Sequence, residues 1–183
     1  MSGIRQRGMT LLEVIIVLII AAILAAISVP AFSDLILTQR AKGAAEGLTS
    51  ALQNAKAEAV KTNSIISIVF KPSATGTAHS SWCYGMTLTG SATCDCTASP
   101  TDCATGSVVD GDTYKDVTAN FNASDLRSFE PVRVGANGTQ GTVVFAAGNN
   151  KDLGVRLSTI GRISVCRPTG TNIARYQDSG ACP

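Results

Sequence analysis

The chain has little of the chemistry from which enzyme sites are usually built. It contains a single histidine, His79, and it has no G-x-x-x-x-G-K-S/T or G-x-G-x-x-G phosphate loop. One histidine cannot form a histidine-based metal cluster, and Asp110-Gly111-Asp112 lacks the full pattern and distal glutamate of an EF-hand. Charged residues make up only 15% of the chain, with 15 basic against 13 acidic. The sequence therefore predicts no enzyme, no cofactor and no metal site, and its bulk charge favours no class of partner.

What the chain does have is a long uncharged segment that directly follows a short basic leader. Two arginines lie within the first eight residues, Gly8 ends that leader, and Glu13 is then the only charged residue before Asp34. The 20 residues from Val14 to Ser33 would span about 30 Å as a helix, which is the thickness of a bilayer's hydrocarbon core. An acid in such a segment costs roughly 2.5–3.5 kcal/mol at mid-membrane, so we expect Glu13 to have a functional partner.

This N-terminus resembles the class III signal of type IV pilins and type II secretion pseudopilins. In that family, prepilin peptidase cuts after the glycine and methylates the new N-terminus, and the acid stays at the fifth position of the mature protein. The resemblance therefore implies cleavage between Gly8 and Met9, with Glu13 as the retained acid. Pro30 also agrees with the helix-bending proline that the family carries late in this segment.

Two simpler explanations account for fewer of these features. An ordinary secretory signal, with a cut after Ala26-Ile27-Ser28, would have a shorter apolar core of about 7–15 residues and no internal acid such as Glu13. A plain single-pass anchor explains the length of the segment but neither Gly8 nor the acid. The pilin-type signal is therefore preferred.

The resemblance divides the chain into a leader (residues 1–8), a transmembrane or filament-core helix (residues 9–33) and a periplasmic globular domain (residues 34–183). It implies a single-pass protein of the inner membrane, in contact with lipid, that later joins a pilus or pseudopilus. The implied partners are prepilin peptidase and other pilin or pseudopilin subunits. Glu13 would then pair with the new N-terminal amine of a neighbouring subunit in the apolar filament core.

Helical periodicity continues beyond the apolar segment. From Asp34 to Lys61, apolar residues recur at spacings of three and four, which places them on one face of a helix. They are Ala41, Ala44, Ala45, Leu48, Leu52, Ala55 and Ala59. The outer face would carry Arg40, Lys42, Glu46, Lys56 and Lys61. The many alanines favour close packing of this helix against a sheet.

After the helix, the period of the apolar residues changes to two. Seven short runs rich in Val, Ile and aromatic residues are expected to form strands. They are Ile65–Phe70, Trp82–Leu88, Val117–Phe121, Val132–Val134, Thr142–Ala146, Leu153–Leu157 and Arg162–Cys166. A long helix followed by such strands predicts a pilin-like α+β fold, with antiparallel sheet packed on the helix. The segment from Gly90 to Asp112 has little periodicity and is expected to be a long surface loop held by cysteines.

Six cysteines lie beyond the apolar segment: Cys83, Cys94, Cys96, Cys103, Cys166 and Cys182. An even number in an exported domain favours disulfides over free thiols, and the C-x-C spacing argues against zinc, which usually binds C-x2-C pairs. We predict a Cys166–Cys182 bridge, because it would tie the C-terminal tail to the last strand. The partners of the other four cysteines stay open.

A closer family match lies where the helix meets the sheet. The series from Leu48 to Val60, followed by a strand and Trp82-x-Tyr84-Gly85, resembles the GspH/FimT group of minor pilins and pseudopilins. The C-terminal Gly161-Arg162-Ile163-Ser164 resembles the last strands of the same group. This resemblance implies a low-abundance structural subunit that initiates or caps a type IV pilus or a type II secretion pseudopilus.

Arginines near the C-terminus suggest an alternative function. Four of them, with no acid between, are Arg156, Arg162, Arg167 and Arg175. Alternation would place Arg156 and Arg162 on one outer sheet face, and some members of the FimT branch bind DNA during DNA uptake in natural transformation. Those members carry Gly-Arg-x-Arg, whereas Ser164 replaces the second arginine here. A filament subunit is therefore favoured over weak, salt-sensitive DNA binding.

Overall fold

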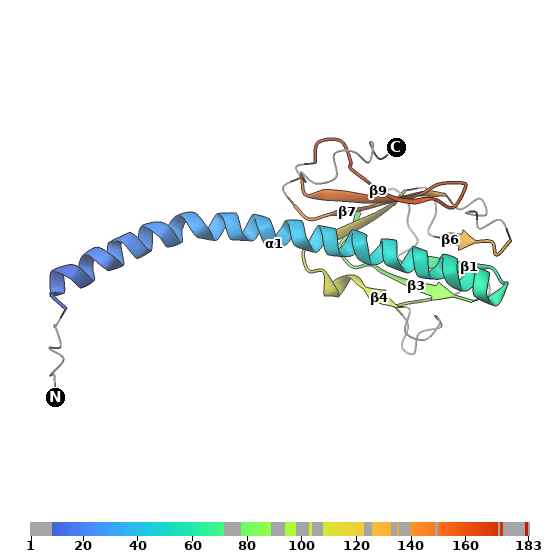
Figure 1. Cartoon of the computed structure of the whole chain (residues 1–183), viewed down its shortest axis with the longest axis horizontal. Helices are drawn as coiled ribbons and strands as arrows, with labels where there is room; N and C mark the ends of the chain where they lie inside the picture. The colour runs from blue at the N-terminus through green and yellow to red at the C-terminus, as the bar shows by residue number, and fades with distance from the viewer. Residues whose placement is uncertain are drawn as a thin grey trace, which may run out of the picture. The chain divides into compact units, whose positions relative to one another are not determined.

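The computed structural model of the chain describes residues 9–71, 78–88, 94–97, 103, 108–122, 126–132, 135, 140–148, 150–171, 173 and 182. The chain divides into two compact units, Met1–Ile36 and Leu37–Pro183. Helix α1 (Leu11–Thr62) is 52 residues long and supplies residues to both units (Figure 1). Pro30 lies within this helix. The expected continuation of the apolar helix beyond Asp34 is therefore confirmed.

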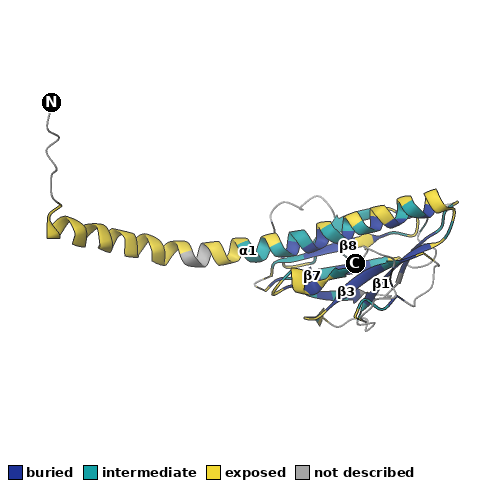
Figure 2. Ribbon diagram, turned by 90° about the horizontal axis from the view of Figure 1, so that it is seen from below, coloured by how far each residue is buried: buried dark blue, intermediate teal, exposed yellow. Residues whose placement is uncertain are grey.

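The second half of α1 buries one apolar face that consists mostly of alanine. Seven of its residues are at most 2% exposed: Ala41, Ala44, Ala45, Leu48, Leu52, Ala55 and Ala59. These are the residues that the helical periodicity predicted, whereas Glu46 and Lys61 are exposed. Figure 2 shows buried and exposed residues alternating along this half of the helix. Because most of this face is alanine, the helix backbone can approach the sheets closely.

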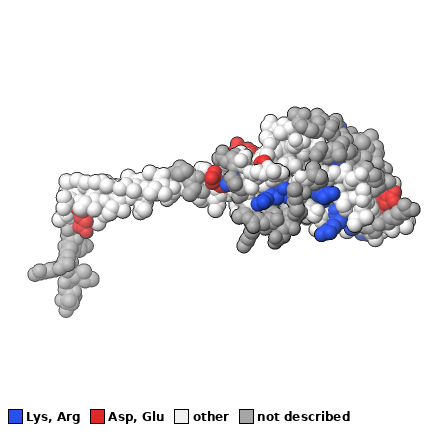
Figure 3. All heavy atoms as spheres, turned by 90° about the horizontal axis from the view of Figure 1, so that it is seen from above, with Lys and Arg blue, Asp and Glu red and all other residues white. Residues whose placement is uncertain are grey.

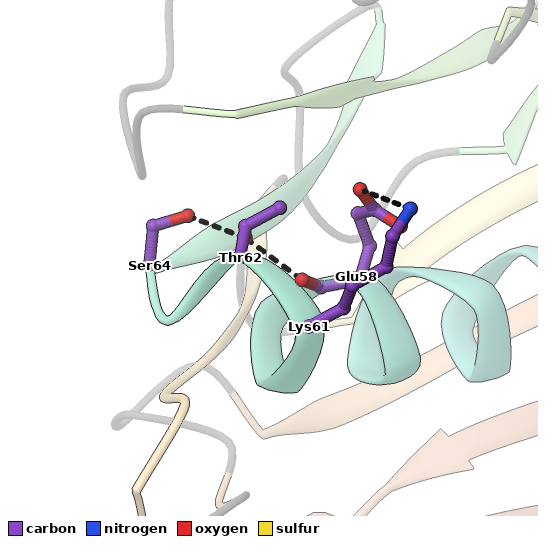
Figure 4. Close-up of polar contacts among 4 residues, drawn as sticks. All are labelled: Glu58, Lys61, Thr62 and Ser64. Carbon is purple, nitrogen blue, oxygen red and sulfur yellow. Dashed lines mark hydrogen bonds and ion pairs between the residues drawn. The ribbon is translucent and has the colours of Figure 1, made fainter.

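The C-terminal end of α1 is closed by short-range hydrogen bonds (Figure 4). The Thr62 hydroxyl lies 2.8 Å from the Glu58 carbonyl oxygen and 2.7 Å from the Ser64 hydroxyl. Asn63 adopts a left-handed φ of 48°, and the Ser64 amide donates to the Ala59 carbonyl at 3.3 Å. Asparagine tolerates this conformation better than most residues, so the Thr62-Asn63-Ser64 sequence ends the helix where the chain must turn into the first strand.

The remaining elements form two antiparallel sheets. The first has the order β4-β3-β1-β6, made of β4 (Val109–Asp110), β3 (Cys83–Thr87), β1 (Ile66–Lys71) and β6 (Leu126–Phe129). The second has the order β2-β5-β7-β8-β9, made of β2 (Ala78–His79), β5 (Thr118–Asn122), β7 (Gly141–Ala146), β8 (Asp152–Leu157) and β9 (Ile163–Cys166). A short 3-10 helix, η1 (Gly111–Thr113), follows β4. The expected α+β fold is confirmed.

Six of the seven expected strands coincide with β1, β3, β5, β7, β8 and β9 to within one residue at every end. The strand expected at Val132–Val134 is wrong at Val132, which lies in a turn after Pro131; the other two residues lie outside the described ones. Strand β6 was not expected, because its centre is the polar pair Arg127-Ser128, which masks the alternation. The loop expected from Gly90 to Asp112 contains β4 and the start of η1 among its described residues.

One continuous core joins the helix to both sheets. Leu48 of α1 belongs to the same buried cluster as Ile68 of β1 and Val155 of β8. Alternation decides which strand residues take part, because Val155 is buried whereas the adjacent Arg156 is exposed. Each large apolar side chain buried in this way contributes about 1.5–3 kcal/mol of transfer free energy. The helix therefore holds the two sheets together through a shared core.

Aromatic rings fill the part of the core next to η1. The Trp82 ring stacks with Tyr84 and Tyr114, with centroid distances of 6.2 and 6.1 Å and interplanar angles of 9°. Its Nε1 donates a hydrogen bond of 2.9 Å to the Val117 carbonyl. Gly111 packs directly on this ring, because a Cβ at that position would lie 2.8 Å from it. Trp82 thus connects β3, η1 and the start of β5.

Two helix glycines make room for Tyr114. A Cβ on Gly43 would lie 3.1 Å from its Cε1 atom, and a Cβ on Gly47 would lie 3.0 Å from its hydroxyl oxygen. A Cβ on Gly47 would also lie 3.5 Å from the Tyr84 hydroxyl oxygen. This hydroxyl has no hydrogen-bond partner in the described part of the chain. Burial, reinforced by the neighbouring Tyr114, raises the pKa of the Tyr84 phenol. This hydroxyl has therefore lost its contact with water without forming a hydrogen bond to the described part of the chain.

We expect Tyr84→Phe to leave the free energy of unfolding unchanged or to raise it by up to about 1 kcal/mol, because it removes an unsatisfied buried hydroxyl. The matched control is Trp82→Phe, which loses a formed hydrogen bond as well as ring volume and should cost about 1–3 kcal/mol. Denaturant titration followed by circular dichroism measures the free energy of unfolding of both variants. Tryptophan fluorescence is unsuitable, because Trp82 is the only tryptophan and Trp82→Phe removes it. A loss above about 1 kcal/mol in Tyr84→Phe would contradict the assignment of Tyr84 as unsatisfied.

Candidate assembly helix and surface sites

The N-terminal part of α1 presents an apolar surface. The large hydrophobic side chains described from Met9 to Ile27 are 42–78% exposed. By length and composition, α1 is long and apolar enough to cross a membrane. In the space-filling view this segment is uncharged apart from one acidic group near its N-terminal end (Figure 3). A surface of this kind is stable in contact with lipid or with other apolar helices, and not in water.

Glu13 lies in the first turn of α1, where the helix N-terminus favours a negative charge. The Glu13 amide donates to the Thr10 hydroxyl at 3.3 Å, and the Val14 amide donates to the Thr10 carbonyl at the same distance. Thr10-x-x-Glu13 is thus the sequence of a capping box, a local signal that the sequence analysis missed. Met9 precedes this cap and is 70% exposed, and the expected cleavage residue Gly8 lies outside the described residues.

The six cysteines form three disulfides, and no described cysteine is free. Cys166 of β9 is bonded to Cys182, the pair expected from the sequence. The other two bonds join Cys83 to Cys96 and Cys94 to Cys103, with Cα–Cα distances of 6.1 and 4.6 Å. The sequence had left these partners open.

Two of the disulfides lie against glycines in the sheets. A Cβ on Gly85 of β3 would lie 2.5 Å from Sγ of Cys103 and 2.7 Å from Sγ of Cys94. A Cβ on Gly154 of β8 would collide in the same way with the Cys166–Cys182 bond. Real side chains do not tolerate such distances, so only glycine leaves room for the disulfide at each of these two positions.

The arginines expected on one sheet face are only partly brought together. Arg156 is exposed and lies opposite Ser164 in the β8–β9 register, and Arg162, also exposed, directly precedes β9. Alternation along the strand predicts that the two side chains share one sheet face. Arg167 is half-buried, and its carbonyl accepts a 3.2 Å hydrogen bond from the Cys182 amide. Arg175 lies outside the described residues. Lys and Arg side chains reach the surface of this unit at several points (Figure 3).

The acidic residues near η1 make turn and ion-pair contacts. The Asp110 carboxylate caps η1 by accepting from the Asp112 amide at 3.0 Å. Asp116, in a left-handed conformation with φ of 63°, pairs with Arg40 of α1 at 2.5 Å. Arg40 also donates to the Lys115 carbonyl at 3.1 Å. Among the described residues there is no group of three His, Cys, Asp or Glu that could hold a metal ion.

Comparison with known proteins gives two family matches and one similar fold. The model of the type II transport protein GspH matches residues 44–176, and that of the prokaryotic N-terminal methylation motif matches residues 4–29. Two crystal structures of the type IV minor pilin FimU from Pseudomonas aeruginosa strain PAO1 are each 23% identical to this chain. The form in space group P21 covers 69% of this chain and 88% of its own, with a TM-score of 0.50. For the P65 form the values are 68%, 90% and 0.47. None of the curated proteins compared matches the chain.

Proposed function

The chain belongs to the GspH family of type II transport proteins and carries a prokaryotic N-terminal methylation motif, and we propose that it is a minor pilin or pseudopilin. In this role it is a structural subunit that initiates or caps a type IV pilus or a type II secretion pseudopilus. Prepilin peptidase removes residues 1–8 and methylates Met9. The apolar segment then anchors the mature subunit in the inner membrane, with its globular unit in the periplasm, until other pilin-like subunits take it into a filament.

The observation that carries this proposal is the contrast between the two halves of α1. The first half leaves its apolar side chains exposed, whereas the second half buries an alanine-rich face against the sheets. A secreted domain has no use for the first half, and a simple anchor does not need Glu13 close to its start. A filament subunit needs both, because the apolar segment must exchange lipid for neighbouring helices and must stop at a defined axial position.

Glu13 provides the axial register in this proposal. A lone carboxylate in an apolar filament core is costly unless a cation pairs with it. Cleavage after Gly8 creates a cation at the right end of the segment, the amine of Met9. Pairing between Glu13 and the Met9 amine of a neighbouring subunit then lowers the cost of burial and favours one axial offset between the two helices.

We expect N-terminal sequencing and intact-mass measurement of the mature protein to show a methylated Met9 as the first residue. The peptidase cuts at the boundary between the basic leader and the apolar segment, so the segment remains on the protein. Removal by an ordinary signal peptidase would instead give a chain that begins near Val29, and that finding would exclude the proposed function.

We expect Glu13→Ala to reduce incorporation into filaments strongly while membrane insertion stays normal, because the substitution removes an ionic partner without reducing hydrophobicity. Quantification of the subunit in sheared filaments and in membranes measures the two effects separately. Thr10→Ala is the matched control, since it removes the helix cap but keeps the acid; it should assemble normally. Normal assembly of Glu13→Ala, or an equal defect in Thr10→Ala, would contradict the pairing role.

The second candidate function is DNA binding during DNA uptake. One observation favours it, namely that Arg156 and Arg162 are both exposed, and strand alternation predicts that they share one sheet face. Arginine forks suit phosphate, but the few arginines here would release few counterions on binding. The half-burial of Arg167 reduces the available charge further. Filament structure therefore remains the favoured function.

We expect the globular unit to show no measurable affinity for duplex DNA at about 150 mM salt, because so few phosphate contacts give only weak binding. Fluorescence anisotropy with labelled DNA at low and moderate salt makes the test. Binding that weakens with salt and disappears when Arg156 and Arg162 are both replaced by Ala would establish the second function. Lys42→Ala on α1 serves as the control for general loss of charge.

A further inference from the structure

The pairing of four cysteines is interleaved along the chain. Cys83 is bonded to Cys96 and Cys94 to Cys103, so each disulfide encloses one cysteine of the other. We propose that formation of this pattern makes the chain a client of a dithiol disulfide isomerase. The inference rests on the proposed export of the globular unit to the periplasm, where disulfides are formed. It concerns maturation of the subunit, before any filament contact.

Chain entropy does not select the native pairs. The native bonds have sequence separations of 13 and 9, whereas the consecutive pairs Cys83–Cys94 and Cys96–Cys103 would have separations of 11 and 7. Loop-closure probability falls with about the three-halves power of length, so the consecutive arrangement is favoured roughly twofold in an unfolded chain. Translocation in chain order adds to this preference, because Cys83 and Cys94 emerge before Cys96.

Contacts of the folded domain select the native pairs instead. Cys94 and Cys103 are buried on Gly85 and share a small apolar cluster with Val69 of β1. Cys96 is only half-buried at the edge of the same cluster. These contacts require β1 and β3 to be paired already. The information that specifies the bonds therefore becomes available only after the sheet has formed, whereas oxidation can occur before it.

Conversion of the consecutive to the native arrangement needs no net oxidant, only a catalytic thiolate. The isomerase thiolate attacks Sγ of Cys96 in the Cys96–Cys103 bond and releases the Cys103 thiolate. That thiolate attacks Cys94 in the Cys83–Cys94 bond, forming Cys94–Cys103 and releasing the Cys83 thiolate. The Cys83 thiolate then attacks the mixed disulfide at Cys96, which forms Cys83–Cys96 and returns the isomerase thiolate. Two disulfides are present before and after the sequence.

The Cys166–Cys182 bond provides an internal comparison. Its two cysteines are the last two in the chain and are consecutive, so an oxidase alone can form it. We therefore expect this bond to form without the isomerase, while the four-cysteine group depends on it. A general effect of the isomerase on folding would instead change all three bonds together.

The test is oxidative refolding of the purified full chain in mild detergent, after denaturation and reduction. A dithiol oxidase is used alone or with a disulfide isomerase, and thiols are trapped with iodoacetamide at successive times. Cleavage before Asp95 and Asp102 and after Tyr84 separates all four cysteines, so peptide mass mapping identifies each bond. We expect consecutive pairs to be at least as frequent as native ones at early times. The isomerase should shorten their conversion from hours to minutes.

Native pairs at the earliest time with oxidase alone, and no effect of the isomerase, would overturn the proposal. In a double replacement, Cys83→Ala with Cys96→Ala, the remaining native bonds are Cys94–Cys103 and Cys166–Cys182. Each then joins cysteines that are consecutive in the chain, so the dependence on the isomerase should disappear. Persistence of the dependence in that variant would also overturn it, because the isomerase would then act on folding in general. A chain that depends on the isomerase but never enters filaments would keep this inference and exclude the proposed function.

Gly85→Ala and Gly154→Ala form a matched pair that tests how the native bonds are selected. Gly85→Ala should raise the final share of consecutive pairs in the four-cysteine group and leave Cys166–Cys182 intact. Gly154→Ala should do the reverse, impairing only Cys166–Cys182. Native pairing of the four cysteines at wild-type levels in a folded Gly85→Ala chain would contradict selection by the folded contacts. If Gly85→Ala does not fold, the double cysteine variant still decides the proposal.

Discussion

Close approach of backbone and side chains is the constraint on which this structure depends. The buried face of α1 is mostly alanine, and a Cβ on Gly43 or Gly47 would lie only 3.1 or 3.0 Å from Tyr114. The same requirement recurs on the sheets, where Gly85 and Gly154 each lie under a disulfide. A helix with larger side chains on this face would stand further from the sheets, and the shared core would lose the dense packing that stabilises it. Small residues therefore determine where the helix and the cross-links lie.

Residues with regular periodicity made most of the fold predictable. The alanine face of α1 and six strands follow from spacings of three and four, then of two. Strand β6 could not be found in this way, because its polar residues are buried for reasons that only tertiary structure supplies. Arg127 is 1% exposed and lies 5.7 Å from the centre of the Phe70 ring, and the Ser128 hydroxyl is hydrogen-bonded to Ser67 at 2.7 Å. Burial of polar groups depends on partners that are distant in sequence.

The candidate site was predictable to the extent that its signals are local. Residues 4–29 match the methylation motif, and the Thr10-x-x-Glu13 cap could have been found from the sequence by its spacing. The Cys166–Cys182 pair was also accessible, because both cysteines lie at the end of the chain. The interleaved pairs were not, since Cys94 and Cys96 are nearly equivalent in sequence. Contacts of the folded domain distinguish them, because Cys94 is buried against Gly85 and Val69 whereas Cys96 is half-buried.

The helix N-terminus alone does not account for a carboxylate at Glu13 in the proposed filament core. The helix dipole contributes about 0.3–1 kcal/mol to a negative charge at this position, which is below the roughly 2.5–3.5 kcal/mol that an unpaired charge costs in an apolar medium. A cation is therefore required. In the proposed mature chain, the basic residue that follows Glu13 is Arg40, which is 27 residues further along and about 40 Å away in a helix. It already pairs with Asp116. In the proposed mature chain, the Met9 amine that cleavage creates is the nearest cation to Glu13, so the proposed function links processing to assembly.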